Sequence, residues 1–474
     1  MMRSGSGSVM PISFARLGRR SGGAPKEDGT AAGRSAQFSG AGAPQIRTGA
    51  LPPQAGPERR LLRPGARQET LRETNLALIT EEIFASLEPL SRADLAIRTG
   101  MTRSTVSRLV DDLLGAGIVR EGSPLAGGTR GRPAVPLTPA RRTLAGLGVE
   151  VSVDFTAARA LDLTGAVLAE EIITADHRAS DPQKVVLEAG RLALRVAGEA
   201  TEAGAQIIGT VLAVPGLVAR DERSLLLAPN LGWKDVDLVD LLRAAEEEQD
   251  SDDAGSFGSF IRAANEAKLA ALAVAQELTE TDGEEQTFLY VSAQMGIGSA
   301  VVIDGVVEAG PHGWGGELGH IAVEPSGPDC SCGSTGCLEV YAGKRALLSA
   351  AGLPPGAEAS EVLELIEDSE GEQAAAAVEH AGWALGIALA AAMNVLDVHE
   401  VVLGGEFGPL TDLLRPGIET QLCRRVLASP WAEFRVRGSA ASNAPATTGG
   451  ALRALRAVVE APLAWVPEAP AVQA

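Results

Sequence analysis

The sequence predicts a small, mainly helical domain followed by a larger α/β body. Residues 67–142 have the apolar spacing of three short helices and an extended pair, whereas the later residues alternate between strand and helix patterns. The charge changes at the same place. Residues 1–142 carry 21 basic and 12 acidic side chains, a net of +9, and residues 143–474 carry 20 and 49, a net of −29. A basic head on an acidic body is typical of a nucleic-acid-binding segment joined to a domain of another kind.

Length and composition set further limits. A chain of 474 residues, 45% of them hydrophobic, is expected to fold into two or three soluble domains. We find neither an apolar run of membrane-spanning length nor a signal peptide, and we expect a cytoplasmic protein that does not contact a membrane. Residues 1–66 are rich in Gly, Ser, Pro and Arg without periodicity and are expected to be a disordered tail, and residues 461–474 are expected to be a C-terminal tail.

The first predicted helix carries Leu76, Ile79, Ile83 and Leu87 at helical spacing, and Pro89 is expected to end it. A second short helix begins after Ser91, which has Asp94 three residues later as a capping pair, and it ends at Gly100.

A third helix is capped by Thr102 and buries a stripe formed by Val106, Leu109, Val110 and Leu113. Ile118 and Val119 then start an extended pair with a glycine-containing turn, which returns to Val135 and Leu137.

Two short helices joined by a glycine turn and followed by such a hairpin predict a winged helix-turn-helix that binds double-stranded operator DNA. The third helix would enter the major groove, and the arginines of the wing suit a narrow minor groove. The alternative is a small helical bundle with a solvated charged face. The candidate DNA-binding residues are Thr102, Arg103, Ser104, Thr105, Ser107, Arg108, Arg130 and Arg132.

The body, residues 143–460, is predicted to be an α/β domain of two lobes. Its expected strands are 145–153, 157–163, 167–173, 207–214, 288–293, 299–303 and 400–403, and its expected helices are 182–204 and 374–396.

Three of the four cysteines lie in one short segment behind a glycine-rich run. His320, Cys330, Cys332 and Cys337 offer four donors with enough chain between them to surround a tetrahedral ion, so they predict a structural zinc site. This clustering also argues against a disulfide framework, since Cys423 stands alone. The alternative is that the four side chains are separate buried residues.

The residues from Gly310 to Glu339 resemble the signature of the ROK family, named for repressors, open reading frames and sugar kinases. They contain Gly-Glu-Leu-Gly-His, Cys-Ser-Cys-Gly and Gly-Cys-Leu-Glu. Four further stretches agree with this resemblance, which covers residues 68 to about 458: 214–218, 228–233, 295–298 and 402–405.

The resemblance implies an actin-like, ribonuclease-H-type fold with two lobes and a sugar in the cleft between them. It implies that Asn230, Glu317, His320 and Glu339 contact the effector, with His320 also a zinc ligand. Carboxylate and imidazole groups suit sugar hydroxyls, which both donate and accept hydrogen bonds in fixed directions. Without the resemblance, the two glutamates would be interpreted as surface charges.

Two departures from the family's kinases indicate that the chain is not an enzyme. Residues 150–155 stand where those kinases have a glycine-rich phosphate turn. Their Asn-Asp-Ala-Asn, whose Asp takes a proton from the sugar, is aligned with residues 262–265, which puts Ala263 at the position of the base. Arg262 then replaces the asparagine and is a candidate effector-binding residue for a phosphate or carboxylate group. The alternative is that Arg262 turns away from the pocket.

We therefore predict a transcriptional regulator, a repressor of carbohydrate-utilisation genes that responds to a sugar or a sugar derivative. A homodimer or a higher homo-oligomer is expected, because two-fold operators require two reading heads. The rivals are an ATP-dependent sugar kinase with an added DNA-binding domain, and a DNA-binding protein whose second domain only dimerises.

Overall fold

The computed structural model describes residues 68–123, 135–248, 255–283, 286–367, 371–439 and 443–466. The expected tail, residues 1–66, lies outside the described residues. So does the tip of the predicted wing, including Arg130 and Arg132.

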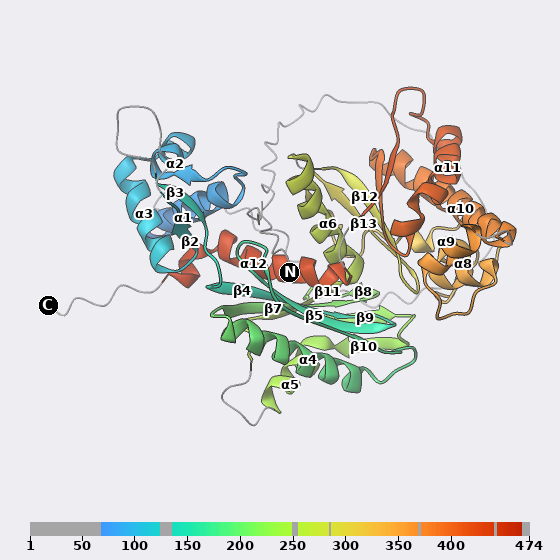
Figure 1. Ribbon diagram of the computed structural model, residues 1–474, viewed down its shortest axis with the longest axis horizontal. Coiled ribbons are helices and arrows are strands. Elements are labelled where there is room, and N and C mark those ends of the chain that lie inside the picture. The colour runs from blue at the N-terminus through green and yellow to red at the C-terminus, as the bar shows by residue number, and fades with distance from the viewer. Residues whose placement is uncertain are drawn as a thin grey trace, which may run out of the picture. The chain divides into compact units, whose positions relative to one another are not determined.

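The amino-terminal domain combines three helices with a small antiparallel sheet (Figure 1). The sheet has the order β1-β3-β2, so a two-residue strand ahead of the second helix joins the predicted pair. The structure confirms the winged helix and adds one strand that we had not predicted. Its elements are α1 (Gln68–Phe84), β1 (Leu90–Ser91), α2 (Arg92–Thr99), α3 (Arg103–Gly115), β2 (Val119–Glu121) and β3 (Pro136–Pro139).

The capping residues set the limits of α2 and the start of α3. Ser91 accepts a hydrogen bond from the backbone of Asp94, whose carboxylate accepts one from the backbone of Ser91. Gly100, with φ of 71°, ends α2. Thr102 accepts from the backbone N–H of Thr105 and caps α3.

The end of α1 differs from the prediction. The helix stops at Phe84, and Leu87, which we expected on its buried face, is 46% exposed. Pro89 disfavours helical dihedrals in the residue before it, and Ser86 donates a hydrogen bond to the carbonyl of Glu88. The chain therefore leaves the helix before Leu87 can reach the core.

The body contains two five-stranded sheets built on one pattern, which confirms the predicted two-lobed α/β architecture. In each sheet three strands in sequence order are antiparallel neighbours, and two later strands add in parallel beside the first of them. The first sheet has the order β11-β7-β4-β5-β6 and the second β14-β13-β12-β15-β16. The strands of the first are β4 (Leu144–Val151), β5 (Phe155–Asp162), β6 (Val167–Thr174), β7 (Gln206–Val214) and β11 (Ile261–Asn265). Those of the second are β12 (Phe288–Ala293), β13 (Ile297–Ile303), β14 (Val306–Val307), β15 (Glu400–Gly405) and β16 (Arg435–Gly438).

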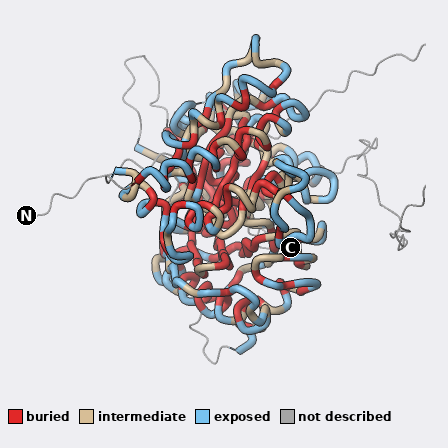
Figure 2. Tube along the Cα trace, turned by 90° about the vertical axis from the view of Figure 1, so that its right-hand side faces the viewer, coloured by how far each residue is buried: buried red, intermediate tan, exposed pale blue. Residues whose placement is uncertain are grey.

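Helices cover both faces of each sheet (Figure 1). On the first sheet, α4 (Pro182–Glu202) lies on one face, with α5 (Leu238–Glu247) packed on it, and α12 (Pro445–Glu460) lies on the other. On the second sheet, α6 (Glu266–Asp282) faces α10 (Glu372–Leu396) and α11 (Phe407–Arg425) across the strands. Buried residues follow the strands and the inner faces of these helices (Figure 2).

The helix α12 is central to packing, and it was not predicted. Its apolar side joins the core of the winged helix through Leu452, Leu455 and Val458. A 3-10 helix, Pro462–Trp465, follows α12, and Leu463 packs against the same cluster. The segment expected as a carboxyl-terminal tail therefore begins with ordered residues.

Close backbone contact between α12 and β4 predicts one large effect on stability. A Cβ atom on Gly148 would lie 1.8 Å from the carbonyl oxygen of Thr447, and backbone atoms cannot move aside as a flexible side chain does. We expect Gly148→Ala to lower the free energy of unfolding by about 3 kcal/mol or more, measured by urea denaturation. Gly115→Ala is the control, because nothing lies within 4 Å of its added atom. Equal stability of the two variants would show that this packing is not as tight as described.

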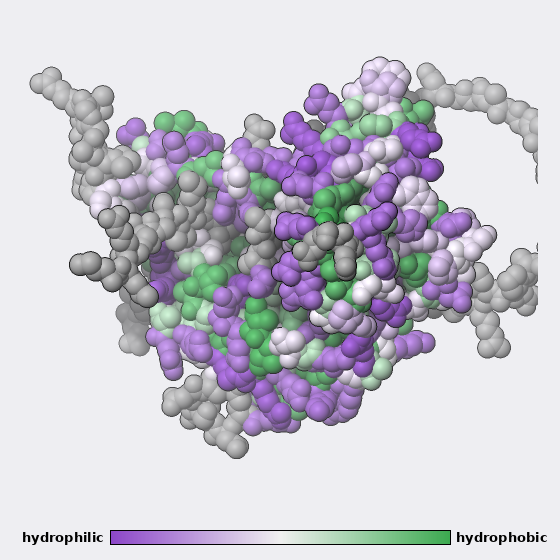
Figure 3. Space-filling view, turned by 45° about the vertical axis from the view of Figure 1, so that its right-hand side comes forward, coloured by the Kyte–Doolittle hydropathy of each residue, from purple (hydrophilic) through white to green (hydrophobic). Residues whose placement is uncertain are grey.

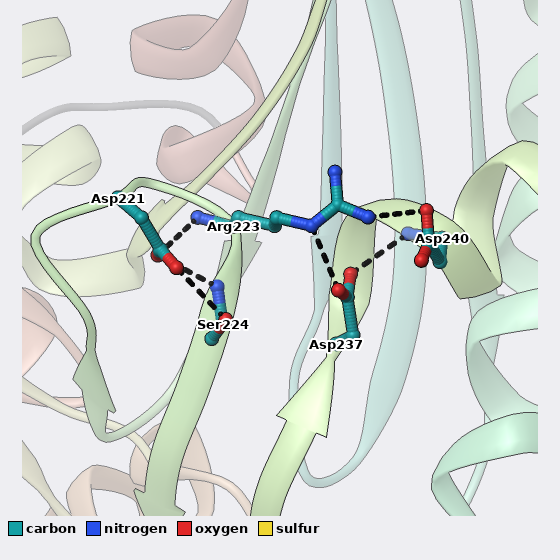
Figure 4. A network of polar contacts seen from close by, with 5 residues as sticks. All are labelled: Asp221, Arg223, Ser224, Asp237 and Asp240. Carbon is teal, nitrogen blue, oxygen red and sulfur yellow. Dashed lines mark hydrogen bonds and ion pairs between the residues drawn. The ribbon is translucent and has the colours of Figure 1, made fainter.

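A second small sheet brings a loop to the region between the lobes. It consists of β8 (Leu217–Val218), β9 (Ser224–Ala228) and β10 (Trp233–Asp237). Arg223, which directly precedes β9, pairs with Asp237 at the end of β10 (Figure 4). The guanidinium Nε lies 2.7 Å from Asp237 Oδ2, and the same group also pairs with Asp240 at the start of α5. The turn between β9 and β10 carries Asn230.

The helix α10 is long and apolar enough to cross a membrane, the only such helix among the described residues. Its most apolar 18-residue window is 61% buried inside the protein, and its side chains form the core of the second lobe. It is therefore the core helix of a globular lobe.

Hydrophilic side chains are spread over the face drawn in Figure 3, with smaller hydrophobic areas between them.

Candidate functional site

A cleft lies at the carboxyl ends of β4, β7, β11 and β12, where loops of the two lobes meet. Small molecules often bind at this end of the strands in open α/β sheets. The cleft encloses about 580 Å³ of non-atom space, part of which is open solvent. The polar residues that line it are Asn230, Asn265, Glu266, Gln294, Glu317, His320, Ser331 and Glu339. Four of the five expected effector residues are thus brought together.

Arg262 is the fifth, and the structure does not bring it to the cleft. Its side chain is about half exposed. Its guanidinium lies 5.0 Å from the centre of the Phe260 ring, and its Nε lies 3.5 Å from Glu222 Oε2. Its position therefore agrees with the alternative expectation, in which Arg262 turns away from the pocket.

An asparagine followed by a carboxylic acid does lie at the cleft, but the two residues are Asn265 and Glu266. From the sequence, we had aligned the kinase Asn-Asp pair with residues 262–263, three positions earlier. Asn265 ends β11 and caps α6, accepting from the backbone of Lys268 and donating to the carbonyl of Gly216 at 3.0 Å. Ala263, which we had aligned with the kinase base, is 1% exposed and belongs to the core. The cleft therefore holds an asparagine and a carboxylic acid that our alignment missed.

Glu339 and Asn230 approach the same glycine from opposite lobes. Glu339 Oε2 accepts a hydrogen bond from the backbone N–H of Ile297 at 3.0 Å. A Cβ atom on Gly296 would lie 2.3 Å from that oxygen and 2.7 Å from the amide nitrogen of Asn230. A side chain at position 296 would displace both groups.

Glu317 lies on the loop just ahead of the 3-10 helix η1 (Leu318–His320). Burial raises its pKa, and Glu339 acts in the same direction, while Lys268 and His320 oppose them. The ammonium of Lys268 donates to the carbonyl of Gly313 at 2.6 Å, so it ties α6 to the glycine-rich loop. Trp314 of that loop donates through Nε1 to the carbonyl of Val218 on the first lobe, at 3.1 Å.

The turn after β4 carries side chains where a phosphate turn would need bare backbone. The N–H of Ser152 donates to the carbonyl of Phe155, and the Ser152 hydroxyl donates to Gln294 Oε1 at 2.9 Å. Ahead of it, Glu150 is fully buried, and neither of its carboxylate oxygens has a hydrogen bond of normal geometry within the described part of the chain. Burial raises its pKa to about 7, although Gln294 and Arg159 act in the opposite direction.

This buried acid predicts a specific pH dependence. The folded chain keeps the proton of Glu150 between pH 4.5 and about 7, whereas the unfolded chain releases it, so stability falls as pH rises through this interval. The fall amounts to about 3 kcal/mol. We expect Glu150→Gln to reduce the fall by this amount, in urea titrations at pH 5 to 8, and to leave the part that comes from the raised pKa of the buried Glu266. The exposed Glu199→Gln should keep the wild-type curve. Parallel curves for all three proteins would contradict the assignment.

The predicted metal ligands form one cluster. The four donor atoms of His320, Cys330, Cys332 and Cys337 lie within 4.8 Å of one another. Cys330 Sγ is 3.9 Å from His320 Nδ1, and Cys332 Sγ is 3.8 Å from Cys337 Sγ. A tetrahedron with 2.3 Å metal–sulfur bonds has edges of about 3.8 Å. The cluster thus has the donors and the spacing of a four-coordinate metal site.

The winged helix presents the other candidate surface. Arg103, Ser104 and Arg108 are exposed on α3. Neither arginine has an ion pair or hydrogen bond within the described residues, so both cations are free for a partner. The hydroxyl group of Thr102, by contrast, is hydrogen-bonded to the hydroxyl groups of Thr105 and Ser104, at 2.9 and 3.0 Å.

The comparison with protein-family models identifies the body. The ROK family model matches residues 147–456. The chain belongs to the ROK family. The model of the IclR helix-turn-helix domain matches residues 82–123, which include α2, α3, β1 and β2 but not β3.

Curated ROK relatives include regulators. The xylose repressor of Bacillus subtilis (strain 168) is 28% identical over 284 residues, 60% of this chain and 69% of the repressor. A putative xylose repressor of Caldicellulosiruptor sp. is 30% identical, over 59% of this chain and 66% of its own length. The DNA-binding transcriptional dual regulator NagC of Escherichia coli is 25% identical, over 70% of this chain and 80% of its own.

Solved structures show the same ROK fold. A ROK family transcriptional regulator, described as a homologue of the E. coli MLC protein, has a TM-score of 0.66 at 23% identity and spans 84% of this chain and 99% of its own. A ROK family glucokinase from Streptomyces griseus has a TM-score of 0.55 at 22% identity and spans 66% of this chain. The regulator structure therefore covers more of this chain than the glucokinase structure does.

Proposed function

We propose that this chain is a sugar-responsive DNA-binding transcriptional regulator, a repressor of carbohydrate-utilisation genes. One observation carries the proposal: free arginines on a winged helix stand in the same chain as a ROK cleft lined with carboxylate and amide groups. The similarity to repressors supports it. The protein acts in the cytoplasm, where its four cysteines stay reduced.

DNA is held by α3 in the major groove. Arg103 and Arg108 supply the cations that phosphates and guanine edges require, and Ser104 and Ser107 supply hydroxyl groups. We also assign Arg130 and Arg132, which lie outside the described residues, to the minor groove. A homodimer places two such heads on a two-fold operator.

The effector binds between the lobes. Asn230 and Asn265 offer amide groups from the first lobe, and Glu317 and Glu339 offer carboxylates from the second. Amides donate and accept and carboxylates accept, so together they match the alternating donors and acceptors of a sugar ring. A ligand that contacts both sides favours one relative position of the lobes, which is the basis for a signal to the DNA-binding domain.

Zinc fits the cluster of His320, Cys330, Cys332 and Cys337, since three thiolates and an imidazole are typical ligands of structural zinc. It supplies rigidity rather than reactivity, because four protein donors leave no open position. His320 also lines the cleft, and Glu339 follows Cys337 by two residues. The site therefore fixes the loop that presents the effector ligands.

A sugar kinase is the second candidate. The alignment put Ala263 at the position of the catalytic base, but the structure places Glu266 in the cleft, which favours a kinase more. A carboxylic acid is present in the cleft, so a missing base no longer argues against phosphoryl transfer. The turn at Ser152 still does, because the backbone N–H of Ser152 already donates to the carbonyl of Phe155 and is not available to a nucleotide phosphate. An ADP-release assay with common hexoses tests this directly, and measurable turnover would favour the kinase.

Sequencing the genomic fragments retained by purified protein tests the proposal. We expect a few promoter fragments with a two-fold symmetric site, enriched over random competitor. Uniform retention, or none, would contradict it.

A further inference from the structure

An apolar patch on the second lobe indicates where a second copy of the chain binds, and this inference rests on the dimer of the proposed function. The patch consists of four side chains at the adjoining ends of α10 and α11: Val395, Leu396, Leu427 and Trp431. We propose that two copies of the chain associate through this patch, packed face to face about a two-fold axis.

The first argument is the exposure of the patch. Leu427 and Trp431 are each 86% exposed, Val395 is 82% exposed and Leu396 is 41% exposed. Single apolar residues are common on protein surfaces, whereas a group of them marks a contact surface. Tryptophan in particular is enriched at the centres of protein interfaces.

A hydrogen-bonded side chain brings the members of the patch together. Asn394 on α10 donates to the carbonyl of Arg425 at 3.0 Å and accepts from the backbone N–H of Leu427 at 2.9 Å. The helices α10 and α11 pack side by side (Figure 1). The end of α10 is thus fixed against the turn that follows α11, and Val395 and Leu427 belong to one surface.

The turn that carries Leu427 and Trp431 is anchored to the protein. Val426 before it belongs to the core of the second lobe, and Ala428 and Phe434 pack against that core. The backbone N–H of Trp431 donates to the carbonyl of Ala428 at 2.9 Å. The turn therefore holds its two large apolar side chains outward, and a preordered surface loses little conformational entropy when a partner covers it.

The charges beside the patch favour a copy of the same chain as that partner. Arg424 and Glu433 are exposed, and neither side chain has an ion pair or hydrogen bond within the described residues. A two-fold contact places the same surface of both copies together, so each surface must supply both members of an ion pair. This surface does so, and an apolar centre with a charged rim is the usual composition of an interface.

Other occupants fit less well. An anionic membrane would be repelled by Glu433 and by Asp397, whose side chain is 92% exposed at the end of α10. A strongly acidic or basic protein would meet one matching and one opposing charge. The patch also lies apart from the DNA-reading surface, because the core clusters of the second lobe and of the winged helix share no residue in the described part of the chain.

Sedimentation velocity of the full chain over a dilution series tests the inference. We expect wild type to sediment at twice the chain mass of 48.7 kDa. Leu427→Glu combined with Trp431→Glu should weaken association at least about 100-fold, because it places four carboxylates in the apolar centre of the dimer. Ile97→Glu is the matched control, since Ile97 is 80% exposed on α2 and outside the patch. Circular dichroism and thermal unfolding establish that each variant is folded.

A charge exchange tests the two-fold arrangement separately. Arg424→Glu should weaken association about tenfold, because two acids then face each other across the axis. Adding Glu433→Arg should restore it, since the exchanged pair is complementary again. Restoration by the second substitution is not expected if the two residues only face solvent, so a double variant as weak as Arg424→Glu would contradict the arrangement.

Three further outcomes would overturn the inference and are distinguishable. A dimeric Leu427→Glu, Trp431→Glu variant contradicts this patch and leaves the dimer of the proposed function intact. A wild-type chain that stays monomeric throughout the dilution series contradicts both. Monomeric wild type that pellets with anionic phosphatidylserine vesicles, while the variant does not, would assign the patch to a membrane.

Discussion

Replacing Cys337 by serine is expected to remove the metal and to unfold the loop at the cleft. Cys337 is fully buried, and its backbone pairs with Ala322 close to His320. Three remaining donors hold zinc far less well, and the binding energy of a structural metal is also folding energy. We expect the free energy of unfolding to fall by several kcal/mol and sugar binding to weaken at least about 100-fold.

The measurement is zinc content by mass spectrometry together with thermal unfolding, with and without a chelator. Cys423→Ser is the matched control, because Cys423 is exposed on α11 and takes no part in the cluster. Full zinc content and wild-type stability in Cys337→Ser would show that the four residues do not form a metal site.

Removing both free arginines of α3 is expected to abolish specific DNA binding. Arg103→Ala with Arg108→Ala deletes two cations that have no partner among the described residues, so the domain itself loses no ion pair. We expect operator affinity to fall roughly 100-fold, and the salt dependence to lose about two counterions.

Fluorescence anisotropy over a range of salt concentrations measures both effects. Arg191→Ala, which removes a charge from α4 where Arg191 pairs with Glu248, should bind the operator within about twofold of wild type. An unchanged salt slope in the double variant would indicate that another surface contacts the phosphates.

Local signals in the sequence predicted the features that depend on neighbouring residues. The capping pair Ser91–Asp94 fixed the start of α2, and Gly100 fixed its end. The metal cluster was predictable because Cys330, Cys332 and Cys337 carry their geometry within a short loop. The β4 to β7 unit followed from its alternating and continuous apolar patterns.

Features that depend on distant residues were not predicted. The fit of α12 against Gly148 joins segments about 300 residues apart, and nothing in either segment names the other. The position of Arg262 depended on where β11 ends. Asn265 caps α6, so residues 265–266 are the ones that reach the cleft. The sequence alignment took Asn265 as the last residue of the kinase motif Asn-Asp-Ala-Asn, whereas it stands at the first. Every residue of the motif was therefore assigned three positions too early.

We propose that sugar occupancy of the cleft controls DNA binding. The most direct test is the affinity of the full-length protein for a retained promoter fragment, measured by anisotropy with and without a saturating neutral sugar that raises its melting temperature. We predict at least about fivefold weaker binding in the presence of that sugar, a coupling of about 1 kcal/mol. Identical affinity under the two conditions would contradict it.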